Sequence, residues 1–184
     1  MDGVIRTRVG YTGGTLKDPT YNELGDHSEA LQIDYDPTRL SYADLLAVFW
    51  KAHNPSSRGW SRQYRNVLFY HDDAQRAAAE ATRKATAERR GRRVRTAIEP
   101  LGTFYRAEGY HQKYRLRSRT EFLRDLTRFY PKARALTDST AATRLNGYLG
   151  GNGTWTQLQK EIDGLGLREE NRRQLVALVK RRDQ

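Results

Sequence analysis

The fold is decided near the start of the chain, in residues 4–14, which read VIRTRVGYTGG. Ile5, Thr7 and Val9 alternate with two arginines, and a period of two residues predicts a half-buried β-strand over residues 4–11. The glycines that follow predict a turn and then a loop. Residues 29–35 show the same alternation and are followed by Asp36-Pro37, which predicts a second strand that stops there.

A helix follows these two strands. Ser41 is a favourable N-cap, and Asp44 stands three residues later, as in a capping box. Apolar residues then recur at helical spacing, so we predict a helix over residues 41–52. Residues 66–70 form a short apolar run that predicts a buried strand.

A second, longer helix is predicted to start at Asp72 or Asp73 and to end near Arg90. Its inner face is predicted to consist of five alanines at helical spacing: Ala74, Ala77, Ala78, Ala81 and Ala85. Residues 94–98 predict another strand, which Pro100 should stop.

The end of the chain has a different character. Leucines and isoleucines recur at helical spacing from Leu145 to Val179, interrupted by a glycine-rich stretch at residues 150–153. We therefore predict an α+β fold, with a mixed sheet and covering helices in a ferredoxin-like two-layer core, plus a C-terminal helical appendage. The predicted domains are residues 1–134 and residues 135–184.

Composition excludes several classes of protein. The 184 residues contain no cysteine, which excludes disulfides, thiolate metal sites and thiol catalysis by these residues. No apolar run approaches the ~20 residues of a membrane span, so we expect a cytoplasmic protein without a membrane partner. We also expect a monomer. The 33 Lys and Arg against 22 Asp and Glu leave a net charge of +11. We interpret this charge as a solvated surface, and a nucleic-acid-binding module using Arg83 to Arg95 and Lys180 to Arg182 is the alternative.

A series of short motifs carries a family resemblance. In order they are Gly10-Tyr11-Thr12-Gly13-Gly14, Pro19-Thr20-Tyr21, His27-Ser28-Glu29-Ala30, Tyr35-Asp36-Pro37, Ser41-Tyr42-Ala43-Asp44-Leu45-Leu46, Phe49-Trp50-Lys51-Ala52-His53-Asn54-Pro55, Gln63-Tyr64-Arg65-Asn66 and Tyr110-His111-Gln112-Lys113-Tyr114. Each motif alone is weak, but this order and spacing resembles the type A methionine sulfoxide reductases from Gly3 to about Leu116. The four histidines show no ligand-like spacing, so we predict no metal site.

The resemblance implies a reaction. Members reduce the S epimer of methionine sulfoxide, free or in oxidised proteins, and so repair oxidative damage. A thiolate attacks the sulfoxide sulfur, methionine leaves, and the enzyme's sulfenic acid condenses with another thiol. The implied reductant is thioredoxin or another thiol, and no bound cofactor is implied.

The resemblance also assigns roles to three residues. Glu29 matches the family's proton donor, and a carboxyl group in an apolar pocket would stay protonated at neutral pH. Tyr21 and Tyr64 match the two hydroxyl donors that hold the sulfoxide oxygen. These are the predicted catalytic and substrate-binding residues.

The resemblance fails at the nucleophile. The family's Gly-Cys-Phe-Trp-Gly segment should lie about a dozen residues ahead of Asp2-Gly3-Val4. We expect such a segment upstream of Met1, carrying either cysteine or selenocysteine. The alternative is a cysteine-free relative that binds methionine sulfoxide or peptides without reducing them. A second departure is Arg58-Gly59-Trp60-Ser61-Arg62, which replaces a polar stretch before Gln63 and places Trp60 where it could alter the pocket.

Overall fold

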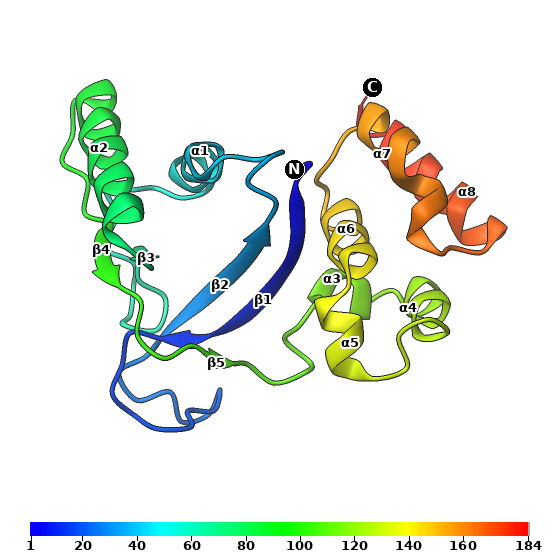
Figure 1. The fold of residues 1–184 in the computed structure, drawn as a ribbon, viewed down its shortest axis with the longest axis horizontal. Helices are drawn as coiled ribbons and strands as arrows, with labels where there is room; N and C mark the ends of the chain where they lie inside the picture. The colour runs from blue at the N-terminus through cyan, green and yellow to red at the C-terminus, as the bar shows by residue number, and fades with distance from the viewer. Residues whose placement is uncertain (184) are drawn as a thin grey trace. The chain divides into compact units, whose positions relative to one another are not determined.

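The computed structural model describes residues 1–183, which form two compact units. The first, here called the helical unit, contains Met1–Arg8, Gln32–Tyr35 and the chain from Glu108 onward. The second, here called the α/β unit, contains Val9–Leu31 and Asp36–Ala107. Two of the strands run from one unit into the other, and Figure 1 shows the order of the elements.

Three strands form one sheet, in the order β2-β1-β5. They are β1 (Val4–Thr12), β2 (Ser28–Tyr35) and β5 (Tyr105–Arg106), and the first two confirm the predicted strands to within one residue. β5 pairs antiparallel with β1, with Gly10 opposite Arg106. A Cβ atom at Gly10 would lie 2.3 Å from the Tyr105 carbonyl oxygen, so a side chain there would separate the two strands.

The other two strands form a separate parallel pair in the α/β unit. β3 (Val67–Tyr70) lies beside β4 (Ala97–Pro100), with Val67 opposite Ala97 and Tyr70 opposite Pro100. Pro100 is the last residue of β4, a position where the missing backbone N–H of proline is tolerated. The strand predicted over residues 94–98 begins three residues before the observed strand, which starts at Ala97. The α+β class is confirmed, with the described strands divided between two small sheets.

Two helices pack with the β3–β4 pair (Figure 1). α1 (Tyr42–Ala52) begins at the predicted N-cap, Ser41, and the capping box with Asp44 is formed. α2 (Asp73–Arg90) is capped by Asp72 and ends at Gly91 in the left-handed conformation, which glycine adopts without strain. Leu46, Trp50, Leu68 and Ala79 are the buried residues of this core.

The predicted inner face of α2 is wrong. Ala74, Ala77, Ala81 and Ala85 are exposed and Ala78 is half-buried, whereas Ala79 and Thr86 are buried. The helix is turned so that Thr82 accepts a 2.9 Å hydrogen bond from the Trp50 indole nitrogen. Alanines on all sides of α2 give a weak apolar stripe, so this polar contact and the burial of Ala79 decide the orientation.

The helical unit contains α3 (Tyr114–Arg117), α4 (Thr120–Thr127), α5 (Ala133–Asp138), α6 (Thr140–Leu149), α7 (Trp155–Glu161), the 3-10 turn η1 (Ile162–Leu165) and α8 (Glu169–Lys180). The predicted C-terminal helical region is confirmed by α6, α7, η1 and α8, and Ser139 is the N-cap of α6. One buried core runs from Leu116 to Val179 and includes Phe122, Leu126 and Leu145. Helices on both sides of residue 135 therefore share this core, and the domain boundary at 134 stays a prediction.

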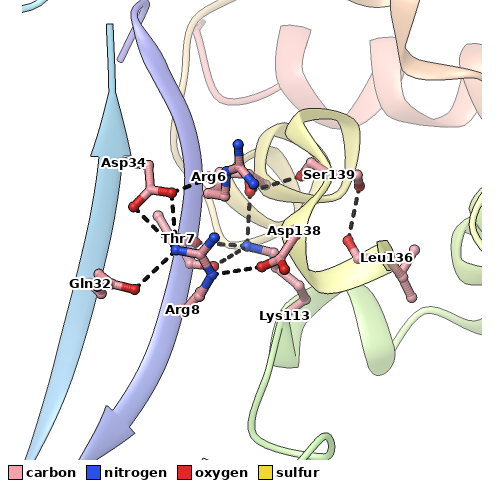
Figure 2. Close-up of polar contacts among 10 residues, drawn as sticks. Arg6, Thr7, Arg8, Gln32, Asp34, Lys113, Leu136, Asp138 and Ser139 are labelled. Carbon is pink, nitrogen blue, oxygen red and sulfur yellow. Dashed lines mark hydrogen bonds and ion pairs between the residues drawn. The ribbon is translucent and has the colours of Figure 1, made fainter. Parts of the chain in front are cut away.

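A polar cluster ties strand residues to helices within the helical unit (Figure 2). Arg8 donates to Asp138 at 2.7 Å and to Asp34 at 3.0 Å. Lys113, which is buried, donates from Nζ to both oxygens of Thr7 at 2.8 Å and to Thr143. Because a buried charge without partners is costly, these bonds hold β1, α3, α5 and α6 in one arrangement.

Asp125 provides a test of the helical core. Its carboxylate is fully buried and accepts hydrogen bonds from the Asn171 amide at 2.7 Å and from the Arg168 backbone and side chain at the start of α8. We expect Asp125→Ala to lower the free energy of unfolding by about 2–3 kcal/mol, measured by urea denaturation at pH 7. Asp163→Ala is the matched control, because Asp163 pairs with Arg172 but is 84% exposed, and its loss should cost below about 1 kcal/mol.

The loss of stability caused by Asp125→Ala should depend on pH. Burial alone would raise the pKa of Asp125, but the hydrogen bonds from Asn171 and Arg168 outweigh burial and hold this pKa below its usual value. The stabilisation is therefore present above the usual aspartate pKa of about 4 and is lost as the pH falls through the lowered pKa. A stability difference between wild type and Asp125→Ala that stayed constant into strong acid would contradict this assignment.

Candidate functional site

The loop between β1 and β2 is held by buried contacts at its base. Leu24 packs with Tyr11 and Ala107, and His27 is almost fully buried. The His27 ring accepts from the Gly14 backbone N–H at 3.2 Å and, through its other nitrogen, lies 2.8 Å from the Leu16 carbonyl oxygen. This histidine therefore orders the loop that carries Tyr21.

The structure brings the three predicted site residues together in the α/β unit. Tyr21 lies in that loop, Glu29 is the second residue of β2, and Tyr64 lies just before β3. The hydroxyl oxygens of Tyr21 and Tyr64 are 3.5 Å apart. Two hydroxyl donors thus point at one small region beside a carboxylate.

Gln63 connects this group. Its side-chain amide donates to Glu29 Oε1 at 2.8 Å and to the Tyr64 hydroxyl oxygen at 3.1 Å, and its backbone carbonyl accepts from the Glu29 N–H at 3.0 Å. Gln63 was part of a motif in the sequence but had no assigned role there. No local pattern distinguishes it, because its two partners come from different segments of the chain.

A second set of bonds fixes the backbone beneath the site. Ser28 donates to the Arg62 carbonyl oxygen at 2.9 Å and accepts from Arg65 at 2.8 Å. Arg65 also forms a bidentate ion pair with Glu99 of β4, in which its two terminal nitrogens lie 2.5 and 2.6 Å from the two carboxylate oxygens. This pairing lowers the pKa of the Glu99 carboxyl. The segment from Arg62 to Arg65 is therefore held against both β2 and β4, and this keeps Gln63 and Tyr64 in register with Glu29.

Electrostatics keep the Tyr64 hydroxyl protonated. The hydrogen bond with Tyr21, together with burial and the nearby charge of Glu29, raises the pKa of Tyr64 to about 12. At neutral pH this hydroxyl is a neutral donor, which is the state needed to bind the negative oxygen of a polarised S–O bond.

The surroundings of Glu29 differ from the prediction. Its side chain is exposed, so the described residues do not enclose it in the apolar pocket that the predicted protonated state requires. What the structure does provide is a fixed position, through Gln63. Glu29 is one of the outward-facing residues of β2, and exposure at that position could not be read from the motif.

A second histidine, His53, has structural contacts. His53 contacts the Phe49 carbonyl oxygen at 2.8 Å and the Thr96 hydroxyl at 2.9 Å, which fixes the end of α1. Within residues 1–183, no group of three or more His, Asp or Glu side chains is placed to hold a metal ion. Over the same residues, no helix has the length and apolar character needed to cross a bilayer.

Comparison with known proteins identifies the family. Residues 1–144 match the family model described as peptide methionine sulfoxide reductase. The chain belongs to this family. Residues 133–181 match a second model, described as the helical domain of selenoprotein methionine sulfoxide reductase A. The resemblance seen in the motifs is thus confirmed, and the members of this family are oxidoreductases that act on methionine sulfoxide.

Individual relatives agree with the family assignment. A peptide methionine sulfoxide reductase of Drosophila melanogaster is 43% identical over 167 residues, which span 90% of this chain and 67% of the relative. The reductase MsrA of Methanothermobacter thermautotrophicus is 48% identical over 126 residues, spanning 62% of this chain and 74% of the relative.

Solved structures show the same fold. Reduced Mxr1 of Saccharomyces cerevisiae is similar with a TM-score of 0.60 and 28% identity, over 65% of this chain and 74% of that one. Methionine sulfoxide reductase A of Corynebacterium diphtheriae is similar with a TM-score of 0.55 and 29% identity, over 64% of this chain and 65% of that one.

Proposed function

We propose that this chain supplies the sulfoxide-binding and proton-donating part of a peptide-methionine (S)-sulfoxide reductase. The observation that carries the proposal is the convergence of Tyr21, Glu29 and Tyr64, with their side chains linked through Gln63. Attack on the sulfoxide sulfur moves negative charge onto its oxygen. Two hydroxyl donors and one acid are the groups that such an oxygen requires. For Glu29 to be that acid, the segment that carries the nucleophile or the bound substrate must cover its exposed side chain.

The electrons must come from a nucleophile outside these 184 residues, because the chain contains no cysteine. A thiolate or selenolate would attack the sulfoxide sulfur, and its oxygen would take up one proton. The S–O bond would then break as the hydroxyl passes to the nucleophile, so that methionine leaves; water is released only when the external thiol reduces the resulting acid. The sulfur of the nucleophile becomes a sulfenic acid, or its selenium a selenenic acid, which an external thiol such as thioredoxin would reduce. No bound cofactor takes part, and a cytoplasmic monomer acting on oxidised proteins or free methionine sulfoxide belongs to the same proposal.

Tests that require turnover use an extended form of the protein, in which a Gly-Cys-Phe-Trp segment precedes Asp2 by about a dozen residues, as in the expectation from sequence. In this form we expect Tyr21→Phe and Tyr64→Phe each to lower kcat about tenfold, since each removes one hydrogen bond to the oxygen while the other hydroxyl remains. Steady-state assays with methionine S-sulfoxide measure the effect, and Tyr35→Phe at the end of β2 is the control. Unchanged kcat in both variants would remove the hydroxyls from the site.

The two alternative functions considered from the sequence, a binding protein without catalysis and a nucleic-acid-binding module, predict other results in these assays. A binding protein without catalysis would retain affinity for methionine sulfoxide, lose it in the tyrosine variants, and show no turnover in the extended form. A nucleic-acid-binding module would bind DNA or RNA with strong dependence on salt. Arg89 and Arg90 lie in the last turn of α2, where positive charge favours the helix dipole, so they have a structural explanation.

A further inference from the structure

Trp60 lies against the site on its solvent side. Its indole stacks on the Tyr64 ring, with ring centroids 4.6 Å apart and planes inclined by 17°. The side chain is nonetheless 83% exposed, the largest exposure among the large apolar residues that are exposed in residues 1–183. Single exposed apolar residues are common on protein surfaces, so the exposure of Trp60 alone does not indicate a function. Its stacking does indicate one, because Trp60 covers the ring of Tyr64, whose hydroxyl contacts Tyr21 and Gln63.

The backbone holds Trp60 in this position. Gly59 has a φ of +76°, and a Cβ atom there would lie 2.5 Å from the Tyr64 carbonyl oxygen, so the loop packs directly on the Tyr64 backbone. On the other side, Ser61 accepts from the Tyr64 N–H at 3.3 Å, and Arg62 donates to the carbonyl oxygens of Asp26 at 3.0 Å and Gly13 at 3.2 Å. The indole is thus anchored on both sides before any ligand arrives, which lowers the entropic cost of using it as a contact.

The position of the indole defines what it can contact. If the sulfoxide oxygen binds the hydroxyls of Tyr21 and Tyr64, three single bonds separate the sulfoxide sulfur from the methionine Cα. The residues that flank methionine in a peptide then lie within reach of the aromatic wall beside Tyr64. Free methionine sulfoxide has no such residues and cannot use that wall.

We propose that Trp60 is a specificity-determining residue that packs its open face against an apolar or aromatic side chain next to methionine sulfoxide in a peptide. The inference rests on the proposed function, since it takes the sulfoxide to be bound at Tyr21 and Tyr64. The preferred substrate class is peptide-bound methionine sulfoxide with an apolar neighbour. Aromatic side chains supply large contact area with few rotatable bonds, which suits recognition of varied sequences.

The test is a binding experiment on the 184-residue chain, which needs no nucleophile. Two capped tripeptides with central methionine S-sulfoxide are titrated by calorimetry, one flanked by phenylalanine and one by glycine. We expect Trp60→Ala to weaken binding of the phenylalanine-flanked peptide about 5–30-fold and to leave the glycine-flanked peptide unchanged. Trp60→Phe should restore most of the affinity, and Trp155→Phe, on α7 in the helical unit, is the control.

The outcomes separate this inference from the proposed function. If Tyr64→Phe weakens both peptides while Trp60→Ala weakens neither, the site stands and the role of Trp60 is overturned. If Trp60→Ala weakens both peptides equally, Trp60 only supports the Tyr64 ring, and the specificity role is again overturned. If no peptide binds, or if Tyr64→Phe also has no effect, the proposed function fails and the inference fails with it.

Discussion

In the extended form, Glu29→Gln is expected to lower kcat for methionine S-sulfoxide by about 10²–10⁴-fold, with little change in KM. Glutamine retains the shape of the side chain and can still hydrogen-bond to the sulfoxide oxygen. It cannot transfer a proton to that oxygen, so the loss falls on the chemical step. Steady-state kinetics with an external thiol measure both constants, and rapid-quench analysis of the first turnover isolates the chemistry.

Glu23→Gln is the matched control for this change. Glu23 lies in the same loop as Tyr21 and is also exposed, and its backbone N–H donates to the Thr20 hydroxyl oxygen at 3.2 Å. Its neutralisation should leave kcat unchanged, which excludes a general effect of one lost negative charge. A kcat for Glu29→Gln equal to that of Glu23→Gln would remove Glu29 from the mechanism.

The 184-residue chain is expected to show no turnover of methionine S-sulfoxide with dithiothreitol. The hydroxyls of Tyr21 and Tyr64 and the carboxyl of Glu29 can donate protons, but none of them can deliver two electrons to sulfur. The extended form should be active, and its Cys→Ser version should be as inactive as the 184-residue chain. Formation of methionine by the purified 184-residue chain, followed by chromatography, would contradict the requirement for an outside nucleophile.

Local signals explain which parts of the fold could be predicted. The capping box at Ser41 depends on residues three apart, and the alternation in residues 4–11 depends on immediate neighbours, so both predictions are confirmed. β5 has only two residues, which is too few to show a pattern in the sequence. Its pairing with β1 depends instead on the absence of a side chain at Gly10. The face of α2 also depends on a distant residue, Trp50.

The candidate site was also predictable only where it did not depend on contacts between distant residues. Tyr21, Glu29 and Tyr64 were selected through a family resemblance, since none of them has a local pattern that separates it from ordinary surface residues. Gln63 could not be selected, because its role depends on two hydrogen bonds formed only in the folded chain. The exposure of Glu29 likewise depends on which segments cover β2, and a motif does not contain that information.

A single-turnover reaction of the extended form with racemic methionine sulfoxide, without added thiol, tests the claim that Tyr21, Glu29 and Tyr64 hold and protonate the oxygen of the S epimer. We expect one equivalent of methionine per protein, formed from the S epimer alone, and a rate lower by at least about 10³-fold in the triple variant Tyr21→Phe, Glu29→Gln, Tyr64→Phe. Equal consumption of the R epimer, or an unchanged rate in the triple variant, would contradict the claim.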